Sequence, residues 1–323
     1  MSKAIFIDQH GSSDVLTFRD HDLPPPGAGQ IQVKNAAIGV NFIDIYQRRG
    51  LYPIGLPAIL GSECAGVIEA IGDGVTGLAV GDHVACLTGT SAYAECSNVA
   101  ASSAAKIPDS IDDDIAAAVF LKGLTTEMLL RQVYLLKAED TCLVHAAAGG
   151  VGTILCQWAR NIGARIIGVV GSDDKAAIAK ANGASEIIVR DTTSDIAAEV
   201  RRLTNGVGVQ VAYDSVGAAT FEASLDSLAP LGHMVTFGNA SGPPPAIEPL
   251  ALARRGSLTL TRPTLFHYAT PEHLPAMATT LFAMVSQGAV IPRISHRIPL
   301  ADAAKAHSLL ESGKTNGSII LTT

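Results

Sequence analysis

A run of small residues between a strand pattern and a helix pattern constrains this chain more than any other feature. Residues 141–146 are typical of a buried strand, and Ile154–Ile162 has the pattern of a helix. Between them, Ala147, Gly149 and Gly152 follow the spacing of a dinucleotide-binding turn in which alanine replaces the usual first glycine. Missing side chains let phosphate oxygens approach the backbone, and the helix N-terminus supplies free N–H groups and a partial positive charge.

The residues after this turn help to decide whether it binds a dinucleotide or is an ordinary connection between a strand and a helix. Residues 165–170 are typical of a second buried strand, which completes a βαβ unit. A NAD site usually carries an acidic residue about 20 residues past the glycines, on the ribose 2′-hydroxyl. Here the strand ends in Gly171 and Ser172, which leave room for a 2′-phosphate, and Lys175 and Arg190 would neutralise its charge.

Two acidic residues beside this strand end argue against a phosphate. Asp173 and Asp174 would repel it if they faced it. The alternative is that they belong to the first turn of the next helix, where acids are favoured by the helix dipole. The small residues and the two cations lead us to expect NADP rather than NAD.

The composition excludes several classes of protein. A chain of 323 residues with 48% apolar content can bury the cores of two domains. A formal charge of −7, with 16% charged residues, gives no basic face for nucleic acid. No apolar run has the roughly 18 residues of a membrane span. An acidic residue follows the N-terminal apolar residues too early for a secretory signal. The five cysteines are scattered without a C-x-x-C pair, which argues against disulfides and fits a reducing cytoplasm.

The patterns change near residue 122. Residues 1–121 are rich in strand and turn signals, with strands expected at Ile31–Val40 and Gly66–Ile71 and a helix at Phe42–Arg48. In residues 122–265, strand and helix patterns alternate, and six strands follow the first helix. Such alternation predicts a doubly wound parallel sheet with helices on both faces.

The remaining residues, 266–323, are too short for a domain of their own. They begin with a helical pattern at Pro271–Gln287 and end with a strand pattern at Ser318–Leu321. We expect them to complete the first domain, so that the parallel-sheet domain is inserted in it. A ligand cleft is then expected where the two domains meet.

Ordered motifs along the whole chain resemble those of a known family. They are Asn41–Tyr46, Gly50–Pro53, Phe120–Thr125, His145–Gly152, Tyr213–Gly217, Phe237–Asn239 and Thr261–Pro263. With these motifs the chain resembles the zinc-independent quinone oxidoreductases of the medium-chain dehydrogenase/reductase superfamily, the zeta-crystallin-like group that includes bacterial NADPH:quinone reductases. The resemblance implies an α/β fold with a GroES-like β-rich catalytic domain, residues 1–121 and 266–323, and an inserted Rossmann domain, residues 122–265.

The zinc alcohol dehydrogenases of the same superfamily differ at their metal ligands. Their catalytic zinc needs cysteine and histidine ligands, whereas residues 39–41 here hold no cysteine and Ser62 stands where those enzymes place a histidine. The lobe that carries four zinc-binding cysteines in those enzymes is reduced to about ten residues, 87–96, with one cysteine. We expect no metal site and interpret Cys64 as a small core residue.

The resemblance also implies which residues contact the cofactor. Those around the pyrophosphate and the 2′-phosphate are Gly149, Gly150, Val151, Gly152, Gly171, Ser172 and Lys175. Those near the nicotinamide end, or in further contact, are Ser215, Phe237, Gly238, Asn239, Arg262, Pro263, Thr264, Lys314 and Thr315. Phe237 could instead belong to the core, and Lys314 to the solvated surface. Arg190 departs from the tyrosine that similar proteins often have, and could bind the adenosine end or be a surface charge.

A last group resembles the residues around the nicotinamide and the acceptor. It consists of Asn41, Asp44, Tyr46, Tyr52, Lys122 and Thr125. Of these, Asn41, Tyr46, Tyr52 and Lys122 are the candidate catalytic donors to an acceptor oxygen that becomes negative. Asn41 and Asp44 could instead only cap the helix that begins near Phe42, and Tyr46 could be packing. His145, inside an apolar strand, is interpreted as a satisfied core histidine rather than a base.

The implied activity is NADPH-dependent reduction of a quinone. A quinone is electron-poor and accepts a hydride without a metal. Two alternatives stay open: reduction of an activated C=C bond in an enone or alkenal, and a non-catalytic NADPH-binding or structural protein. By resemblance we expect a cytoplasmic homodimer joined through the last strand of the parallel sheet, Ser257–Thr261, with no membrane or nucleic-acid partner.

Overall fold

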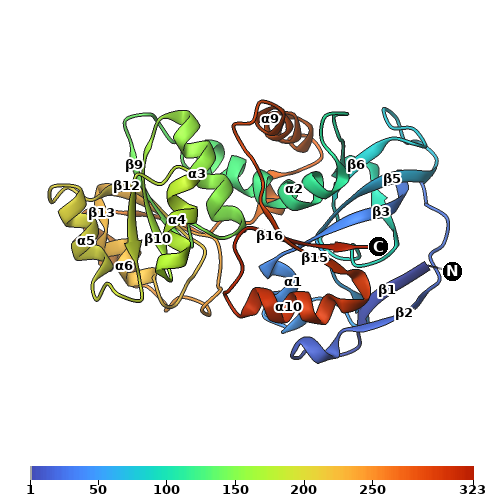
Figure 1. Cartoon of the computed structure of the whole chain (residues 1–323), viewed down its shortest axis with the longest axis horizontal. Coiled ribbons are helices and arrows are strands. Elements are labelled where there is room, and N and C mark those ends of the chain that lie inside the picture. Colours follow the sequence, from blue (N-terminus) through green and yellow to red (C-terminus); the bar gives the residue numbers. More distant parts are fainter. Residues whose placement is uncertain (1) are drawn as a thin grey trace. The chain divides into compact units, whose positions relative to one another are not determined.

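The computed structural model describes residues 2–323, which form two compact units (Figure 1). The first unit consists of residues 2–124, Ala269–Gln287 and Pro292–Thr323, and the second of Thr125–Tyr268 and Gly288–Ile291. The sequence patterns placed the first junction at residue 122. It falls later because one helix, α2 (Asp113–Met128), runs through that position.

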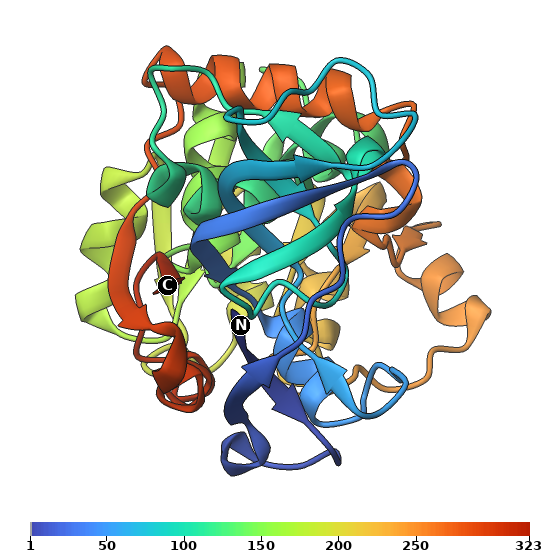
Figure 2. The same ribbon diagram turned by 90° about the vertical axis from the view of Figure 1, so that its right-hand side faces the viewer.

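A seven-stranded sheet is the largest element of the first unit (Figure 2). Its strands, in spatial order, are β15 (Ile294–Pro299), β16 (Ser318–Thr322), β3 (Gln30–Val40), β5 (Glu63–Ile71), β6 (His83–Leu87) and β8 (Ala104–Lys106), and β7 (Cys96–Ala100) also pairs with β3. β15 and β16 are parallel, whereas β16 runs antiparallel to β3. The last strand of the chain therefore completes a sheet that begins near residue 30.

A three-stranded sheet and several helices complete the first unit. The sheet has the order β2 (Thr17–His21), β1 (Ser2–Ile7) and β4 (Ala58–Ile59), and the helices are α1 (Phe42–Arg48), α9 (Leu274–Ser286) and α10 (Ala303–Glu311). Apolar residues of both sheets and of α10 share one core, which includes Ile5, Ile31, Leu60, Tyr93 and Ala306. This shared core fixes α10 against the strands that carry the polar residues described below.

A six-stranded parallel sheet forms the second unit. Its order is β11 (Glu186–Val189), β10 (Arg165–Val170), β9 (Thr141–His145), β12 (Val209–Asp214), β13 (Leu228–Thr236) and β14 (Thr259–Thr261). Every pairing is parallel, and the direction of winding reverses between β9 and β12. This is the doubly wound order in which ligands bind beyond the carboxyl ends of the strands. The expected α/β fold, a β-rich domain with a Rossmann domain inserted, is confirmed.

The helices of the second unit differ from the sequence expectation mainly at their starts. They are α3 (Gly150–Ile162), α4 (Asp173–Ala181), α5 (Ile196–Leu203), α6 (Phe221–Asp226), α7 (Pro249–Arg254) and α8 (Leu265–Tyr268). The prediction that a helix begins at Ile154 was wrong, because α3 already includes Gly150 and Gly152. In the first unit, the helix predicted at Pro271–Gln287 begins later than predicted, at Leu274, and is α9, which is separate from α8. Among residues 2–323, no helix is both long and apolar enough to cross a membrane.

Candidate functional site

The turn after β9 is tight because two backbone segments approach each other. Ala146 has a φ of 51°, and α3 begins at Gly150, with Gly149 as its N-cap. A Cβ on Gly152 would lie 2.2 Å from the carbonyl oxygen of Ala146, so only glycine fits there. The methyl group of Ala147, at the position of the usual first glycine, is accommodated because residue 168 on β10 is itself a glycine. The turn is therefore a tight connection that opens a helix at glycines, and helix N-termini of this kind offer free backbone N–H groups.

Two cations lie beside the end of β10. A Cβ on Gly171 would be 3.6 Å from the Arg190 guanidinium, which follows β11. Lys175 lies in the first turns of α4, and its pKa is lowered by burial and further by the positive charge of Arg190. The ion pair of Arg190 with Asp191 is long, 3.7 Å, and both side chains are exposed. A bound phosphate would relieve the repulsion between the two cations.

The remaining predicted residues at this strand end are Ser172, Asp173 and Asp174. Ser172 is the N-cap of α4, and its hydroxyl makes no capping hydrogen bond. Asp173 and Asp174 are exposed and lie in the first turn of α4, where the helix dipole favours them. Their position therefore agrees with the alternative that these two acidic residues stabilise the start of the helix.

A buried carboxylate shapes the loop after β12. Asp214 accepts hydrogen bonds from the backbone N–H groups of Val216 and Gly217, at 2.8 and 3.0 Å, and from the hydroxyls of Thr220 and Ser224, both at 2.7 Å. Four donors around one side chain fix the path of the backbone on either side of Ser215.

The loop after β13 packs directly on this one. Phe237 donates its N–H to the carbonyl of Asp214 at 2.8 Å, and a Cβ on Gly238 would lie 2.3 Å from the carbonyl oxygen of Ser215. Arg262, just past β14, donates to the carbonyl of Gly238 at 3.2 Å and, through its other Nη, to the Asn239 amide oxygen at 3.1 Å. Five predicted cofactor residues are thus brought together, and Pro263 and Thr264 follow Arg262 in the chain.

His145 is buried and bonded on one side only. Its Nε2 lies 2.9 Å from Ser224 Oγ, and because Ser224 donates its proton to Asp214, His145 is the donor in this pair. Burial lowers the pKa of His145, which favours the neutral ring. The expected core position of His145 is confirmed, but Nδ1 has no hydrogen-bond partner, so the expectation that the ring is satisfied was wrong for this nitrogen. The carboxylate contacts the serine rather than the histidine, so the three do not have the order of a hydrolytic triad.

In the first unit, α1 is capped by two of the predicted site residues. Asp44 Oδ2 accepts the backbone N–H of Asn41 at 2.8 Å, so the alternative role as a helix cap is real. The side chain of Asn41 has a second function, because its Nδ2 donates to Glu63 Oε1 at 2.8 Å. Capping and a place in the site are therefore compatible for Asn41.

Glu63 is a residue that sequence reasoning missed. It is fully buried and accepts three hydrogen bonds: from Asn41 at 2.8 Å, from Lys122 Nζ at 3.1 Å, and from the backbone N–H of Leu121 at 2.7 Å. The sequence signal for it is an acidic residue at the start of an apolar strand, where a charge needs a partner. That partner is the ammonium group of Lys122, which is itself only 5% exposed.

Asp44 is the second buried carboxyl group of the first unit. Burial raises its pKa to about 6, against hydrogen bonds from Ser62, from the Asn41 backbone and from Tyr93 that favour the charged form; the nearby Glu63 raises it further. Ser62 Oγ donates at 2.7 Å and Tyr93 OH at 3.1 Å. Ser62, at the position of a histidine in the zinc enzymes, thus serves here as a hydrogen-bond donor.

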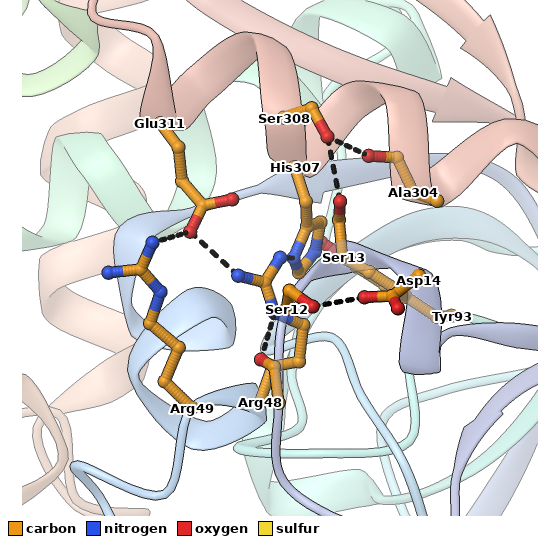
Figure 3. A network of polar contacts seen from close by, with 11 residues as sticks. Ser12, Ser13, Asp14, Arg48, Arg49, Tyr93, Ala304, His307, Ser308 and Glu311 are labelled. Carbon is orange, nitrogen blue, oxygen red and sulfur yellow. Dashed lines mark hydrogen bonds and ion pairs between the residues drawn. The ribbon is translucent and has the colours of Figure 1, made fainter.

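A directed chain of hydrogen bonds leads from Asp44 toward the surface, and Figure 3 shows its outer members, Arg48, His307 and Glu311. Arg48, fully buried, lies 3.1 Å from His307 Nδ1, and since arginine only donates, Nδ1 is the acceptor. The proton of His307 is then on Nε2, which donates to Tyr93 OH at 2.9 Å, and Tyr93 donates to Asp44. Burial, and then the charge of Arg48, lowers the pKa of His307 to about 3, so its ring is neutral.

The outer end of this chain is an ion pair on α10. Glu311 accepts from Arg48 and from Arg49, each at 2.6 Å. Figure 3 shows both contacts. Arg48 also donates its Nε–H to the carbonyl of Gly11 at 3.1 Å. The chain therefore ties α1 to α10 and fills the interior with satisfied polar groups.

Three aromatic rings cluster on α1 and the segment after it. Tyr46 lies 6.0 Å from Phe42 and 5.2 Å from Tyr52 between ring centroids, and Tyr52 donates its backbone N–H to the carbonyl of Tyr46 at 3.2 Å. Tyr46 is 8% exposed, which agrees with the alternative that it is a packing residue. Its ring and its carbonyl group also position Tyr52. The two predicted tyrosines are thus neighbours.

The other predicted residues lie as follows. Thr125, on α2, and Thr315, just before β16, are buried, and Lys314 is exposed, as its surface alternative requires. Cys64 is buried opposite Cys86 in the pairing of β5 with β6, in agreement with a core role. Within residues 2–323, no group of three or more histidine, cysteine or acidic side chains is placed to hold a metal ion.

Comparisons with known proteins agree along the whole chain. Residues 27–128 match the family described as alcohol dehydrogenase GroES-like domain, and residues 150–283 match the zinc-binding dehydrogenase family. A quinone oxidoreductase of Pseudomonas aeruginosa is 48% identical over 99% of both chains, and a 2-haloacrylate reductase of a Burkholderia species is 39% identical over 99% of both chains. The structure of Escherichia coli quinone oxidoreductase complexed with NADPH superposes with a TM-score of 0.97 at 41% identity and covers 100% of both chains.

Proposed function

Because the chain belongs to the quinone oxidoreductase group of the medium-chain dehydrogenase/reductase superfamily, we propose that it is an NADPH:quinone oxidoreductase. The observation that carries this proposal is the surface at the carboxyl ends of the parallel strands. A glycine turn opens α3 there, and Lys175 and Arg190 lie together beside Gly171. This surface offers backbone N–H groups to a pyrophosphate and two cations to a 2′-phosphate.

NADPH supplies a hydride when it is bound. Gly149, Gly150, Val151 and Gly152 hold its pyrophosphate, and Gly171, Ser172, Lys175 and Arg190 hold its 2′-phosphate. Residues proposed for its nicotinamide end and for further contacts are Asn41, Thr125, Ser215, Phe237, Gly238, Asn239, Arg262, Pro263, Thr264, Lys314 and Thr315. Asp44 is fully buried and serves this end by capping α1 at Asn41. The close packing of the loops after β12 and β13 supports this assignment, because it leaves their shape fixed before any ligand binds.

The acceptor is an electron-poor quinone. Its reduction to the hydroquinone takes up a hydride equivalent and one proton, so one acceptor oxygen becomes negative before it is protonated. We assign Asn41, Tyr46, Tyr52 and Lys122 as the donors that stabilise this oxygen. Asn41 and Lys122 are held by Glu63, and the two tyrosines by their mutual packing. Positioning of a flat acceptor among fixed donors supplies the catalysis, without a metal ion in the proposed site.

A two-part assay tests the proposal. Thermal unfolding with and without NADPH measures binding, and loss of NADPH absorbance with a panel of benzoquinones measures turnover. We expect a raised unfolding temperature and quinone-dependent oxidation. A protein that neither binds NADPH nor oxidises it with any quinone contradicts the proposal, and tight binding without turnover on any acceptor supports a non-catalytic role instead.

A second candidate function is reduction of an activated C=C bond. The similarity to a 2-haloacrylate reductase favours it as the runner-up, because an acrylate carries such a bond. Steady-state rates with enones, alkenals and 2-haloacrylates, measured beside the quinones, separate the two. A kcat/KM higher for the alkenes than for every quinone would replace the first proposal by the second.

We further propose a homodimer and a cytoplasmic location. β14 is the edge strand of the six-stranded sheet, and pairing with its copy would protect that edge. The five cysteines are free thiols, which fits a reducing compartment. Light scattering that gives only a monomer at micromolar protein contradicts the dimer, and recovery in an oxidising extracellular fraction contradicts the location.

A further inference from the structure

We propose that Glu63 is a positioning residue that sets the places of Lys122 and Asn41 for the acceptor. The inference rests on the proposed quinone reductase function and assigns a role to a residue that contacts the donors rather than the substrate. It is drawn from the hydrogen bonds of one buried carboxylate.

A single oxygen of Glu63 holds both donors. Oε1 accepts from Asn41 Nδ2 at 2.8 Å and from Lys122 Nζ at 3.1 Å. The other oxygen, Oε2, accepts the backbone N–H of Leu121 at 2.7 Å, which fixes the plane of the carboxylate against α2. Moving the carboxylate therefore moves an amide and an ammonium together.

The fold leaves no other place for this carboxylate. Glu63 begins β5, whose pairing with β3 places it beside Gly39. A Cβ on Gly39 would lie 2.0 Å from Glu63 Oε1 and 2.6 Å from the carbonyl oxygen of Ala117. A side chain at residue 39 would displace the carboxylate, so the glycine is part of the same arrangement.

Burying the charge of Glu63 costs free energy that a purely structural residue would not need to spend. Removing a carboxylate and an ammonium from water carries a large desolvation cost, and well-packed apolar residues often serve stability as well or better. A lysine side chain is long and flexible, and at the surface of a protein it moves freely. The buried pair fixes that side chain, which is the condition for a donor to meet a developing negative charge without rearrangement.

The first test compares two equal substitutions on one strand. Glu63→Gln removes the buried charge, whereas the control Glu69→Gln removes an exposed one, whose ion pair with Lys34 is 3.8 Å long. We expect Glu63→Gln to lower kcat with a benzoquinone by about 100-fold, the order of loss that a small misplacement of catalytic groups produces. The Kd for NADPH should change far less than kcat, because Asn41 is the proposed cofactor contact that Glu63 holds. Glu69→Gln should match the wild type in both.

Glu63→Asp guards against a variant that simply fails to fold. It keeps the charge beside Lys122 and withdraws the carboxylate by one methylene. We expect a folded protein with a near-native unfolding temperature and a kcat lowered by about 10-fold or more. Wild-type kcat in this variant would overturn the inference, because the position of the carboxylate would then be irrelevant.

A double-mutant cycle distinguishes positioning from general support. If Glu63 acts largely through Lys122, adding Glu63→Gln to Lys122→Met should lower kcat much less than it does in the wild type. Full additivity of the two losses would overturn the inference. A wild-type protein that is inactive with every quinone would instead refute the proposed function, whereas an active wild type with an equally active Glu63→Gln refutes only the role of Glu63.

Discussion

Replacing Tyr93 by phenylalanine should destabilise the protein by an amount that grows with pH. Tyr93 is fully buried, donates to Asp44 at 3.1 Å and accepts from His307 at 2.9 Å. Phenylalanine leaves the His307 N–H without a partner, at about 1–3 kcal/mol, and removes a hydrogen bond to a carboxylate, at about 1.5–3 kcal/mol when that group is charged. The second loss depends on the charge of Asp44.

The pH dependence follows from the raised pKa of Asp44. Its folded value of about 6 lies above the ordinary 3.8, so stability from this group is full below about pH 4 and is lost as pH rises through 6. Ionisation of Asp44 costs the wild type about 3 kcal/mol in the folded state. Without the Tyr93 donor the pKa of Asp44 moves still higher, so the loss continues through neutral pH.

Urea denaturation followed by circular dichroism at about pH 5 and pH 7.5 measures this effect. We expect Tyr93→Phe to lower the free energy of unfolding by about 1–2 kcal/mol more at the higher pH. Tyr134→Phe is the control, because Tyr134 donates to Asp140 at 3.2 Å but is only partly buried. Its loss should be smaller. An equal loss at both pH values for Tyr93→Phe would refute the role given to Asp44.

Three further substitutions address other parts of the structure. Burial lowers the pKa of His307 to about 3, so the stability that its neutral ring contributes is present above pH 6.5 and is lost as pH falls, by up to about 5 kcal/mol. His307→Gln should lack this loss, and acid denaturation curves like those of the wild type would contradict it. Gly152→Ala places a methyl group 2.2 Å from the Ala146 carbonyl, so calorimetric titration should give NADPH affinity lowered by about 10-fold or more, and native affinity would disprove the close approach. Arg190→Ala should weaken NADPH binding by about 10-fold and leave NADH binding unchanged, whereas equal effects on both would remove Arg190 from the 2′-phosphate site.

The parallel sheet was the most predictable part of the fold. Its strands are buried on both faces, so they form continuous apolar runs, and β10 has the bounds that the sequence predicts. The sequence patterns do not reveal that α2 already begins at Asp113, because its residues 116–120 are all buried, which leaves no polar face to show the helical period. The start of α3 was missed because glycines in its first turn reflect a close backbone approach rather than helix propensity.

The pieces of the proposed cofactor surface could be located from the sequence because they are local, each at the end of one strand. The polar interior of the first unit could not, because its partners are distant in the chain. Glu63 is 22 residues from Asn41 and 59 from Lys122, and Arg48 is 259 residues from His307. No spacing rule joins such residues. A charged residue within an apolar segment indicates locally that a buried polar contact exists, but its partner is known only from the tertiary structure.

The pairing of β16 with β3 has a consequence for synthesis on the ribosome. Ile319 lies opposite Val40, so β3 gains this neighbour only after the whole parallel-sheet unit has been translated. We expect the second unit, which is nearly continuous in sequence, to bury its core while the nascent chain is still growing. The edge of β3 stays uncovered until then, which makes this strand the place where a chaperone or a neighbouring nascent chain would engage first.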